Sequence, residues 1–240
     1  MFQNKHYRQL FSGKDLTYFT VSVKETDLRI GASKNLYDVA LQSVIKYRRQ
    51  IEQYIKSHKT FLTSLTPVGC ESDCAYIIKR MCKAAHKAGV GPMACVAGII
   101  SELVAIDLLK HSEEIIVENG GDIFIKTNSP RKVGIYAGTS PFNNRLGMVI
   151  EPQHTPMGIC TSAGKIGHSL SFGHADAVTV LSKDTALADA AATAVGNMVK
   201  TPRDIDRAIA FARTIDGVLG VIIIIDDSMG AWGDIKIVKL

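Results

Sequence analysis

Apolar and polar residues recur with different spacings along the chain, and the spacing predicts the type of element. Over residues 35–58 apolar side chains return every three or four positions, opposite lysine, arginine and glutamine, which predicts an amphipathic helix. Residues 72–88 predict a second helix, ended by Gly89. A third helix begins near Pro92, and it is so apolar that we expect it in the middle of the protein.

Alternating and β-branched segments predict strands early in the chain and again after the third helix. A further helix is expected at 184–199, and a last one begins at Thr201, with Thr201 as N-cap and Pro202 as the first helical residue. The expected strands are 17–26, 27–32, the strand–turn–strand unit 113–127, then 132–138, 145–152, 157–164, 174–182, 218–226 and 234–240.

Strands and helices in this order do not alternate regularly, which predicts an α+β fold with mainly antiparallel sheets packed with helices. The sequence contains no internal repeat and no low-complexity linker, so residues 1–240 are expected to form a single domain. The longest apolar run, 218–225, is too short for a membrane helix and is expected to be a buried strand.

Composition narrows the classes of function. Hydrophobic residues make up 46% and charged residues 21%, which is ordinary for a soluble globular protein. The first residues lack the apolar segment of a signal peptide, so a cytoplasmic protein without a membrane partner is expected. The net charge of +5 is spread over basic residues interleaved with acids, so nucleic acid is not expected as a partner.

Five cysteines, an odd number without a signal peptide, indicate reduced thiols. Cys70 and Cys74 form a C-x3-C pair after a Pro-Val-Gly segment, but no second close pair completes a zinc site. A redox or sulfur-carrying role for this pair stays open. Cys82 and Cys95 are expected to be small core residues of helices.

Asn119, Gly120, Gly121 and Asp122 lie between two apolar strands. Glycine supplies the positive φ that a hairpin turn needs, so the segment is typical of a simple turn. The alternative is functional: two glycines let the backbone approach a ligand, which Asp122 would then face.

Asp189 and Thr193 are one turn apart on the helix expected at 184–199, and both project from one face. Carboxylate and hydroxyl oxygens suit Mg²⁺ or Ca²⁺, and the neighbouring alanines leave room for close packing. The alternative is a helix packed tightly on a sheet, with Asp189 stabilised by the dipole of its own helix.

The segment 158–178 concentrates hydroxyls, glycines and histidines next to Cys160. Such donors and backbone amides suit an anionic group such as phosphate, and His168 could act as an acid or a base near neutral pH. The polar residues considered are Thr161, Ser162, Gly164, His168, Ser169, Ser171 and His174.

Taken in order, NGGD at 119–122, TSAG at 161–164, the histidine at 168 and ADAAATA at 188–194 resemble the ApbE family of flavin transferases. The segments GVGPMACVAG, VENGGDIFI and TSAGKIGHSLSFGHADAVTVL are similar to those of the UPF0280 branch, which is ApbE-like. The order and spacing of these segments are more specific than any one of them.

The resemblance implies transfer of FMN from FAD to a threonine or serine of a target protein, with Mg²⁺. It implies Asp189 and Thr193 as metal ligands. It also implies a FAD or related flavin nucleotide pocket formed by Asn119, Gly120, Gly121, Asp122, Thr161, Ser162 and Gly164.

The sequence also departs from the family pattern. The family's histidine is followed three residues later by an aspartate that acts as the base, whereas Ser171 stands at that position here. A family lysine segment is replaced by residues 96–99. Because serine does not accept a proton near neutral pH as a carboxylate does, the departure argues against the usual transfer reaction.

Two alternatives from other classes stay open. One is a thiol- or persulfide-carrying protein of cysteine or homocysteine assimilation, in which Cys160 is a thiolate with a lowered pKa beside His168, or the Cys70/Cys74 pair carries the sulfur. The other is a non-enzymatic homo-oligomeric binding module.

Overall fold

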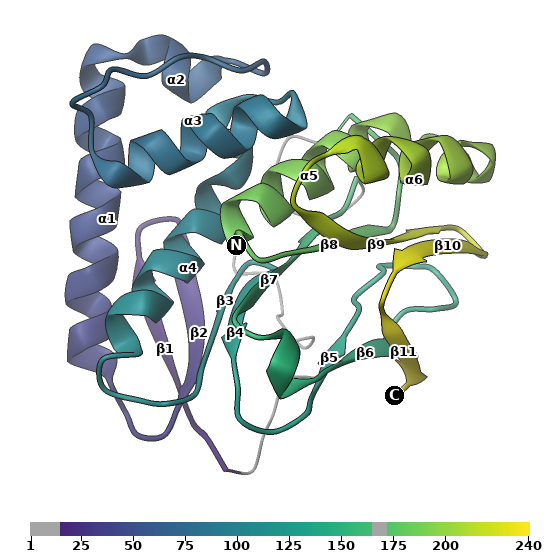
Figure 1. Cartoon of the computed structure of the whole chain (residues 1–240), viewed down its shortest axis with the longest axis horizontal. Helices are drawn as coiled ribbons and strands as arrows, with labels where there is room; N and C mark the ends of the chain where they lie inside the picture. The colour runs from purple at the N-terminus through teal and green to yellow at the C-terminus, as the bar shows by residue number, and fades with distance from the viewer. Residues whose placement is uncertain (1–14, 165–171) are drawn as a thin grey trace.

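An eight-stranded sheet runs through a computed structural model of the chain, which describes residues 15–164 and 172–240 (Figure 1). The strand order is β1-β2-β3-β4-β7-β8-β9-β10, and each neighbouring pair is antiparallel. The α+β class with mainly antiparallel sheets is confirmed. The strands are β1 Thr17–Val23, β2 Thr26–Ala32, β3 Ile115–Asn119, β4 Asp122–Lys126, β7 Met157–Ser162, β8 Ala177–Ser182, β9 Val218–Ile225 and β10 Ser228–Gly233.

The two faces of this sheet are covered differently. Helices cover one face and share with it the larger apolar cluster. A three-stranded sheet, ordered β11-β6-β5, packs on the other face around a second cluster that includes Ile123, Ile125, Met148 and Ile224. Its strands are β5 Arg131–Gly134, β6 Leu146–Ile150 and β11 Lys236–Lys239. Alternating side chains of the central strands therefore enter two separate cores.

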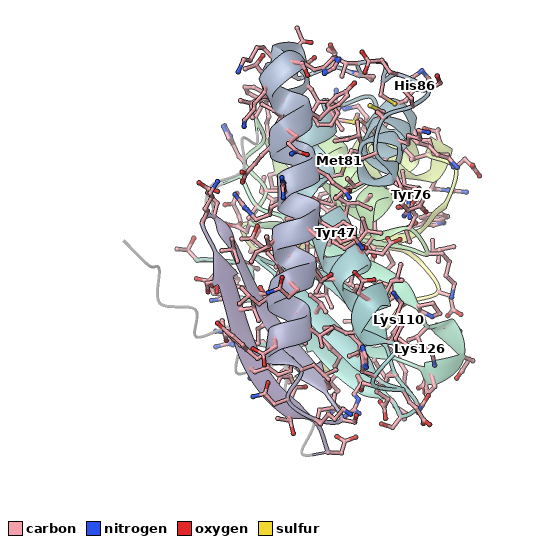
Figure 2. All side chains as sticks on the ribbon, turned by 90° about the vertical axis from the view of Figure 1, so that its left-hand side faces the viewer. Tyr47, Tyr76, Met81, His86, Lys110 and Lys126 are labelled. Carbon is pink, nitrogen blue, oxygen red and sulfur yellow. The ribbon has the colours of Figure 1, made fainter. Side chains whose placement is uncertain are left out.

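The helices follow the periodicity of the sequence. They are α1 Tyr37–Ser57, α2 Lys59–Thr63, α3 Tyr76–Ala88, α4 Val96–Leu108, α5 Thr185–Met198 and α6 Ile205–Thr214, with 3₁₀ turns at Pro92–Cys95, Pro152–His154 and Pro202–Asp204. Gly89 ends α3 with φ of 73°, and Thr201 and Asp204 form a capping box before α6. Figure 2 shows the long helix α1 in front, with α3 beside its upper part.

The apolar helix α4 is central, as expected, because most of its residues are buried. Among the described residues no single helix is long and apolar enough to cross a membrane. Only α3 and residues 92–108 reach that length and composition together, and they are bent by 104° where they meet.

Two short elements were not predicted. The edge strand β10 contains two glycines and shows no clear alternation of apolar residues, so its conformation comes from pairing with β9. The five-residue helix α2 is too short to show a period.

Candidate functional site

The NGGD segment forms the tight turn between β3 and β4. Asn119 pairs with Asp122 across the hairpin, and Gly120 and Gly121 have φ of 66° and 109°. Such angles favour glycine, so the turn predicted from these residues is confirmed. The Gly121 N–H donates to Oε1 of Glu118 at 3.0 Å, and a side chain at Gly120 would face open space.

Strand β7 lies beside β4 and brings the second motif next to the first. The register Ile123↔Ile159 continues to the strand ends, where Cys160 and Thr161 of β7 are neighbours of Asp122 on β4. A Cβ atom at Gly121 would be 3.7 Å from the Thr161 carbonyl oxygen. The NGGD and TSAG segments are thus neighbours at one end of the central strands.

Helix α5 adds a second buried carboxyl group to this place. Asp189 Oδ2 accepts from the Gly98 N–H at 2.8 Å, and the neighbouring Ala97 amide also favours the charged carboxylate. Both amides belong to the first turn of α4, so Asp189 occupies the N-terminus of α4. The position of Asp189 is therefore explained by the N-terminus of α4, and the dipole of α5, its own helix, is not needed to explain it.

The two helices cap each other. Glu102, one turn beyond Gly98 on α4, accepts from the Thr185 N–H at 2.7 Å, and Thr185 begins α5. Arg80 of α3 pairs with Glu102 at 2.7 Å and with Asp184, the N-cap of α5, at 3.0 Å. This reciprocal arrangement fixes Asp189 above the sheet.

Burial raises the cost of ionising both Asp122 and Asp189, and the charge of Asp189 adds to that cost at Asp122. Burial, together with the charge of Asp189, raises the pKa of Asp122 well above its ordinary value. Burial also raises the pKa of Asp189 to about 7, although the Gly98 and Ala97 amides act to lower it. Because both carboxyl groups are desolvated and close, we infer that Asp122 is protonated when Asp189 is charged.

Cys160 is a buried thiol and not the reactive thiolate that was expected from the sequence. It is fully buried, with Sγ 3.5 Å from the Thr185 carbonyl oxygen. Burial, followed by the charges of Asp122 and Asp189, raises the pKa of the Cys160 thiol. The expected lowering of this pKa is wrong, because the sulfur is buried and the nearby Asp122 and Asp189 carboxyl groups also disfavour a thiolate.

The remaining predicted residues lie at different depths. Thr193 is half-buried one turn beyond Asp189, and Ser162 is half-buried at the end of β7. Thr161 Oγ1 lies 2.9 Å from Thr179 Oγ1. Gly164 donates its N–H to the Ala175 carbonyl at 2.9 Å. His168, Ser169 and Ser171 lie outside the described residues.

A family model described as "AbpE bacteria" matches residues 8–229. The chain belongs to this family. It is 40% identical over 220 residues to a UPF0280 protein of Methanocella arvoryzae, covering 90% of this chain and 89% of that one. It is 44% identical over 204 residues to a UPF0280 protein of Methanobrevibacter smithii, covering 82% and 85%. The predicted UPF0280, ApbE-like relationship is confirmed.

Solved structures share the fold at low identity. The flavin transferase ApbE of Vibrio cholerae aligns with a TM-score of 0.62 at 15% identity, over 90% of this chain and 96% of that one. The apo form of the flavinyl transferase ApbE of Pseudomonas stutzeri gives 0.60 at 15% identity, over 90% and 94%. The UPF0280 chain therefore has the ApbE fold.

Some residues of the UPF0280 site are not indicated by the sequence patterns considered above. The sequence places Gly98 in an apolar helix and in the segment that replaces the family lysine, but it does not indicate that the Gly98 amide and its lack of a side chain admit Asp189. Glu118, an acid within an apolar strand directly before NGGD, was a signal that could have been used. Thr185 is fully buried, and its Oγ1 has no hydrogen-bond partner in the described part of the chain.

The donor set of this UPF0280 site suits a hard divalent cation. Asp122, Asp189 and Thr193 offer oxygen ligands, and a cation would make it less costly to ionise both buried carboxyl groups. Residues 15–164 and 172–240 contain no group of three or more His, Cys, Asp or Glu side chains arranged for a metal. The cation would thus be shared with a hydroxyl, a bound ligand or water.

Two cavities lie away from this site. One, of about 480 Å³, lies between α1 and the end of α4, and the other, of about 630 Å³, between the residues after α4 and the start of β1. Lys110 and His111 line both. Neither is lined by the NGGD, TSAG or α5 residues, so the carboxyl pair, rather than a large cavity, marks the candidate site.

Proposed function

We propose that this chain is an ApbE-like protein that binds a flavin nucleotide, FAD in the first instance, together with Mg²⁺ at the Asp122–Asp189 pair. The observation that carries the proposal is the pair of buried carboxyl groups with raised pKa values, held between the start of β4 and the N-terminus of α4. The two aspartates would hold a divalent cation, which would compensate their charge and that of a phosphate group.

The chain's own residues have distinct tasks in this proposal. The N-terminus of α4 orients Asp189 through the Gly98 N–H, which leaves Oδ1 for the cation. Thr193, one turn along α5, supplies a hydroxyl ligand. Gly120 and Gly121 keep side chains away from the turn where the nucleotide approaches.

Half-buried Thr161 and Ser162 form the polar wall beside the carboxyl pair. Mg²⁺ supplies Lewis-acid stabilisation of charge on phosphoryl oxygens when it is bound. Because the pKa of Asp122 is raised, this residue would hold a proton in the free protein and would give it up if it bound a cation.

We propose further that bound FAD stays intact. The resemblance places Ser171 where the family has its aspartate base, and a serine hydroxyl cannot take up the proton of an attacking threonine or serine near pH 7. The proposed activity is therefore binding, without the transfer that the names of the neighbours describe.

The binding experiment is calorimetric titration of FAD into the full chain, with and without Mg²⁺. We expect FAD to bind more tightly with Mg²⁺ than without it. In Asp189→Asn, the gain in FAD affinity that Mg²⁺ gives should fall at least about tenfold. Asp227→Asn, the same change at an exposed aspartate, is the matched control and should bind as the wild type does. Absence of heat for both ligands at millimolar concentration contradicts the proposal.

Intactness of the flavin is measured separately, by chromatography of the nucleotides after long incubation with a threonine-containing acceptor peptide. FAD should be recovered unchanged. Recovery of AMP and flavin attached to the peptide would contradict the absence of transfer while leaving the binding proposal in place.

A further inference from the structure

Helix α5 carries its polar side chains at every fourth position. They are Thr185, Asp189, Thr193 and Asn197, and every other residue of Thr185–Met198 is apolar or glycine. Because four residues make slightly more than one helical turn, these side chains form one slowly winding row. The proposed function uses Asp189 and Thr193 and leaves the last member of the row, Asn197, without a task.

The row on α5 rises from the core towards the surface. Thr185 is fully buried and Asp189 is 9% exposed, whereas Thr193 and Asn197 are half-buried. With a rise of about 1.5 Å per residue, the Asn197 backbone lies about 12 Å beyond that of Asp189 along the helix. A ligand that is held at Asp189 and follows the row outwards therefore reaches Asn197.

The TSAG segment runs beside this row in the same direction. Its first residue, Thr161, lies beside the NGGD turn. Its last residue, Gly164, packs so closely on Gly173 that a Cβ atom would clash with the Gly173 carbonyl group, and Gly173 packs in the same way on Gly196 of α5. The row on α5 and the TSAG segment thus both lead from the Asp122–Asp189 pair to the neighbourhood of Asn197.

A backbone hydrogen bond fixes the orientation of the Asn197 amide group. Oδ1 of Asn197 accepts from the Phe172 N–H at 2.9 Å, and only the oxygen of an amide accepts from an N–H group. With Oδ1 committed to Phe172, the amide offers a ligand only its Nδ2 donor. Within residues 15–164 and 172–240 this donor has no hydrogen-bond acceptor, so Asn197 is an oriented donor that awaits one.

An oriented donor selects a ligand group that only accepts hydrogen bonds. Asparagine reads adenine with both amide atoms, because Oδ1 accepts from the amino group while Nδ2 donates to a ring nitrogen. This pairing is closed to Asn197, since its Oδ1 is occupied. The ring of a flavin carries carbonyl oxygens, which only accept, so the flavin end of FAD suits Asn197 better than the adenine end.

We propose that the Asn197 amide nitrogen donates to a carbonyl oxygen of the flavin ring, while the pyrophosphate of the same FAD molecule lies at the Asp122–Asp189 pair. Asn197 is then a specificity-determining residue, which distinguishes the flavin half of the dinucleotide from the adenine half. This inference rests on the proposed function, from which it takes the position of the phosphates. It adds the direction in which the nucleotide lies, outwards along α5.

A purely structural role for Asn197 makes a different demand on the side chain. Holding Phe172 requires only the oxygen, which aspartate also has, whereas a bond to a flavin carbonyl requires the amide nitrogen. Asn197→Asp therefore keeps the acceptor for the Phe172 N–H and removes the donor. Asn143 is a matched control, because it is also half-buried and its Oδ1 accepts from the Ala137 N–H at 3.0 Å. It precedes β6, whose sheet packs on the other face of the main sheet.

The experiment is calorimetric titration of FAD, FMN and ADP, each with excess Mg²⁺, into the full chain and into Asn197→Asp and Asn143→Asp. FMN carries the flavin ring, ADP carries the adenine ring, and both carry phosphate. We expect Asn197→Asp to lower the affinity for FAD and for FMN at least about tenfold, as loss of a hydrogen bond to a bound ligand does, and to leave the affinity for ADP within about twofold. Asn143→Asp should bind all three nucleotides as the wild type does.

Two further measurements separate the loss of the donor from effects of charge and of folding. Asn197→Ala removes the donor without adding a charge, and it should lose FAD affinity as Asn197→Asp does. Urea denaturation should show that Asn197→Asp is as stable as the wild type, because the acceptor for the Phe172 N–H is retained.

Three outcomes overturn the inference. An unchanged FAD affinity in Asn197→Asp does so and leaves the proposed function in place. An affinity for ADP that falls as far as that for FMN does so as well, because the variant would then act through its charge on the phosphates. A wild-type chain that binds none of the three nucleotides overturns both the inference and the proposed function.

Discussion

Gly98 has no side chain at the point where α4 and α5 touch. A Cβ atom there would lie 2.7 Å from the Thr185 carbonyl oxygen and 2.8 Å from Cβ of Asp189. The helix backbone around it cannot yield without losing the bond from the Gly98 N–H to Asp189. One missing methyl group therefore sets the distance between two helices.

We expect Gly98→Ala to lower the free energy of unfolding by about 2 kcal/mol through overpacking. This loss would appear even though alanine is intrinsically better than glycine in a helix by about 1 kcal/mol. Gly69→Ala, at a position with free space, is the control and should change stability by less than about 0.5 kcal/mol. Urea denaturation measures both, and an unchanged or more stable Gly98→Ala would show that the helices can separate at no cost.

The predictable part of the site at this scale is the turn at Gly120 and Gly121, because positive φ is a local property of glycine. The raised pKa values of Asp122 and Cys160 were not predictable. Both depend on neighbours that strand pairing and helix packing supply from distant parts of the chain.

At the scale of elements, Asp107 joins α4 to α1. Its carboxylate accepts from Ser43 Oγ at 2.8 Å and lies 3.4 Å from Nζ of Lys46, both on α1, and accepts from Lys110 at 2.9 Å. Burial alone would raise the pKa of Asp107, but the hydrogen bonds from Lys110, Ser43 and Tyr47 outweigh it and lower the pKa to about 2.

A lowered folded-state pKa stabilises the protein above the unfolded pKa of about 4, and the effect disappears as pH falls through about 2. We expect Asp107→Asn to cost about 1–2 kcal/mol at pH 7, reduced by solvent around the two lysines, and nothing near pH 2. Guanidinium titrations of wild type and variant at several pH values test this. A difference that stays constant with pH would contradict the role of the charge.

Arg80 ties α3 to the reciprocal caps of α4 and α5. Its side chain is only 16% exposed, and Glu102, which it faces, is only 8% exposed. Removing one partner of such a pair leaves a buried charge without compensation.

We expect Arg80→Met to lower the free energy of unfolding at pH 7 by about 3 kcal/mol. Arg207→Met is the matched control, because Arg207 pairs with Asp204 at 2.8 Å but is 67% exposed, and its loss should cost less than about 1 kcal/mol. Chemical denaturation of the two variants compares the pairs, and equal costs would contradict a special role for Arg80.

At the scale of the whole molecule, the main sheet contains strands from near both ends of the chain, β1 and β10 (Figure 1). One apolar core lies on each face of this sheet. Neither core can lose its sheet face without exposing the other. A single domain over 1–240 stays a prediction from the sequence, and the shared sheet is a physical reason for it.

We therefore expect one cooperative unfolding transition. The single tryptophan, Trp232 on the edge strand β10, reports the sheet, and circular dichroism reports the helices. Their denaturation midpoints should coincide in the wild type and shift together in Gly98→Ala. Separate midpoints would indicate two folding units. Size-exclusion chromatography in the same buffer tests the predicted homo-oligomer.

The sequence by itself determined the periodic elements, the glycine turn, the cap at Thr201 and the family, because these depend on neighbouring residues or on the order of short motifs. Only the tertiary structure placed Asp189 on the Gly98 amide of α4 and set Asp122 beside Cys160. Burial and proximity between distant segments control ionisation and reactivity, and they come into being only when the chain is packed.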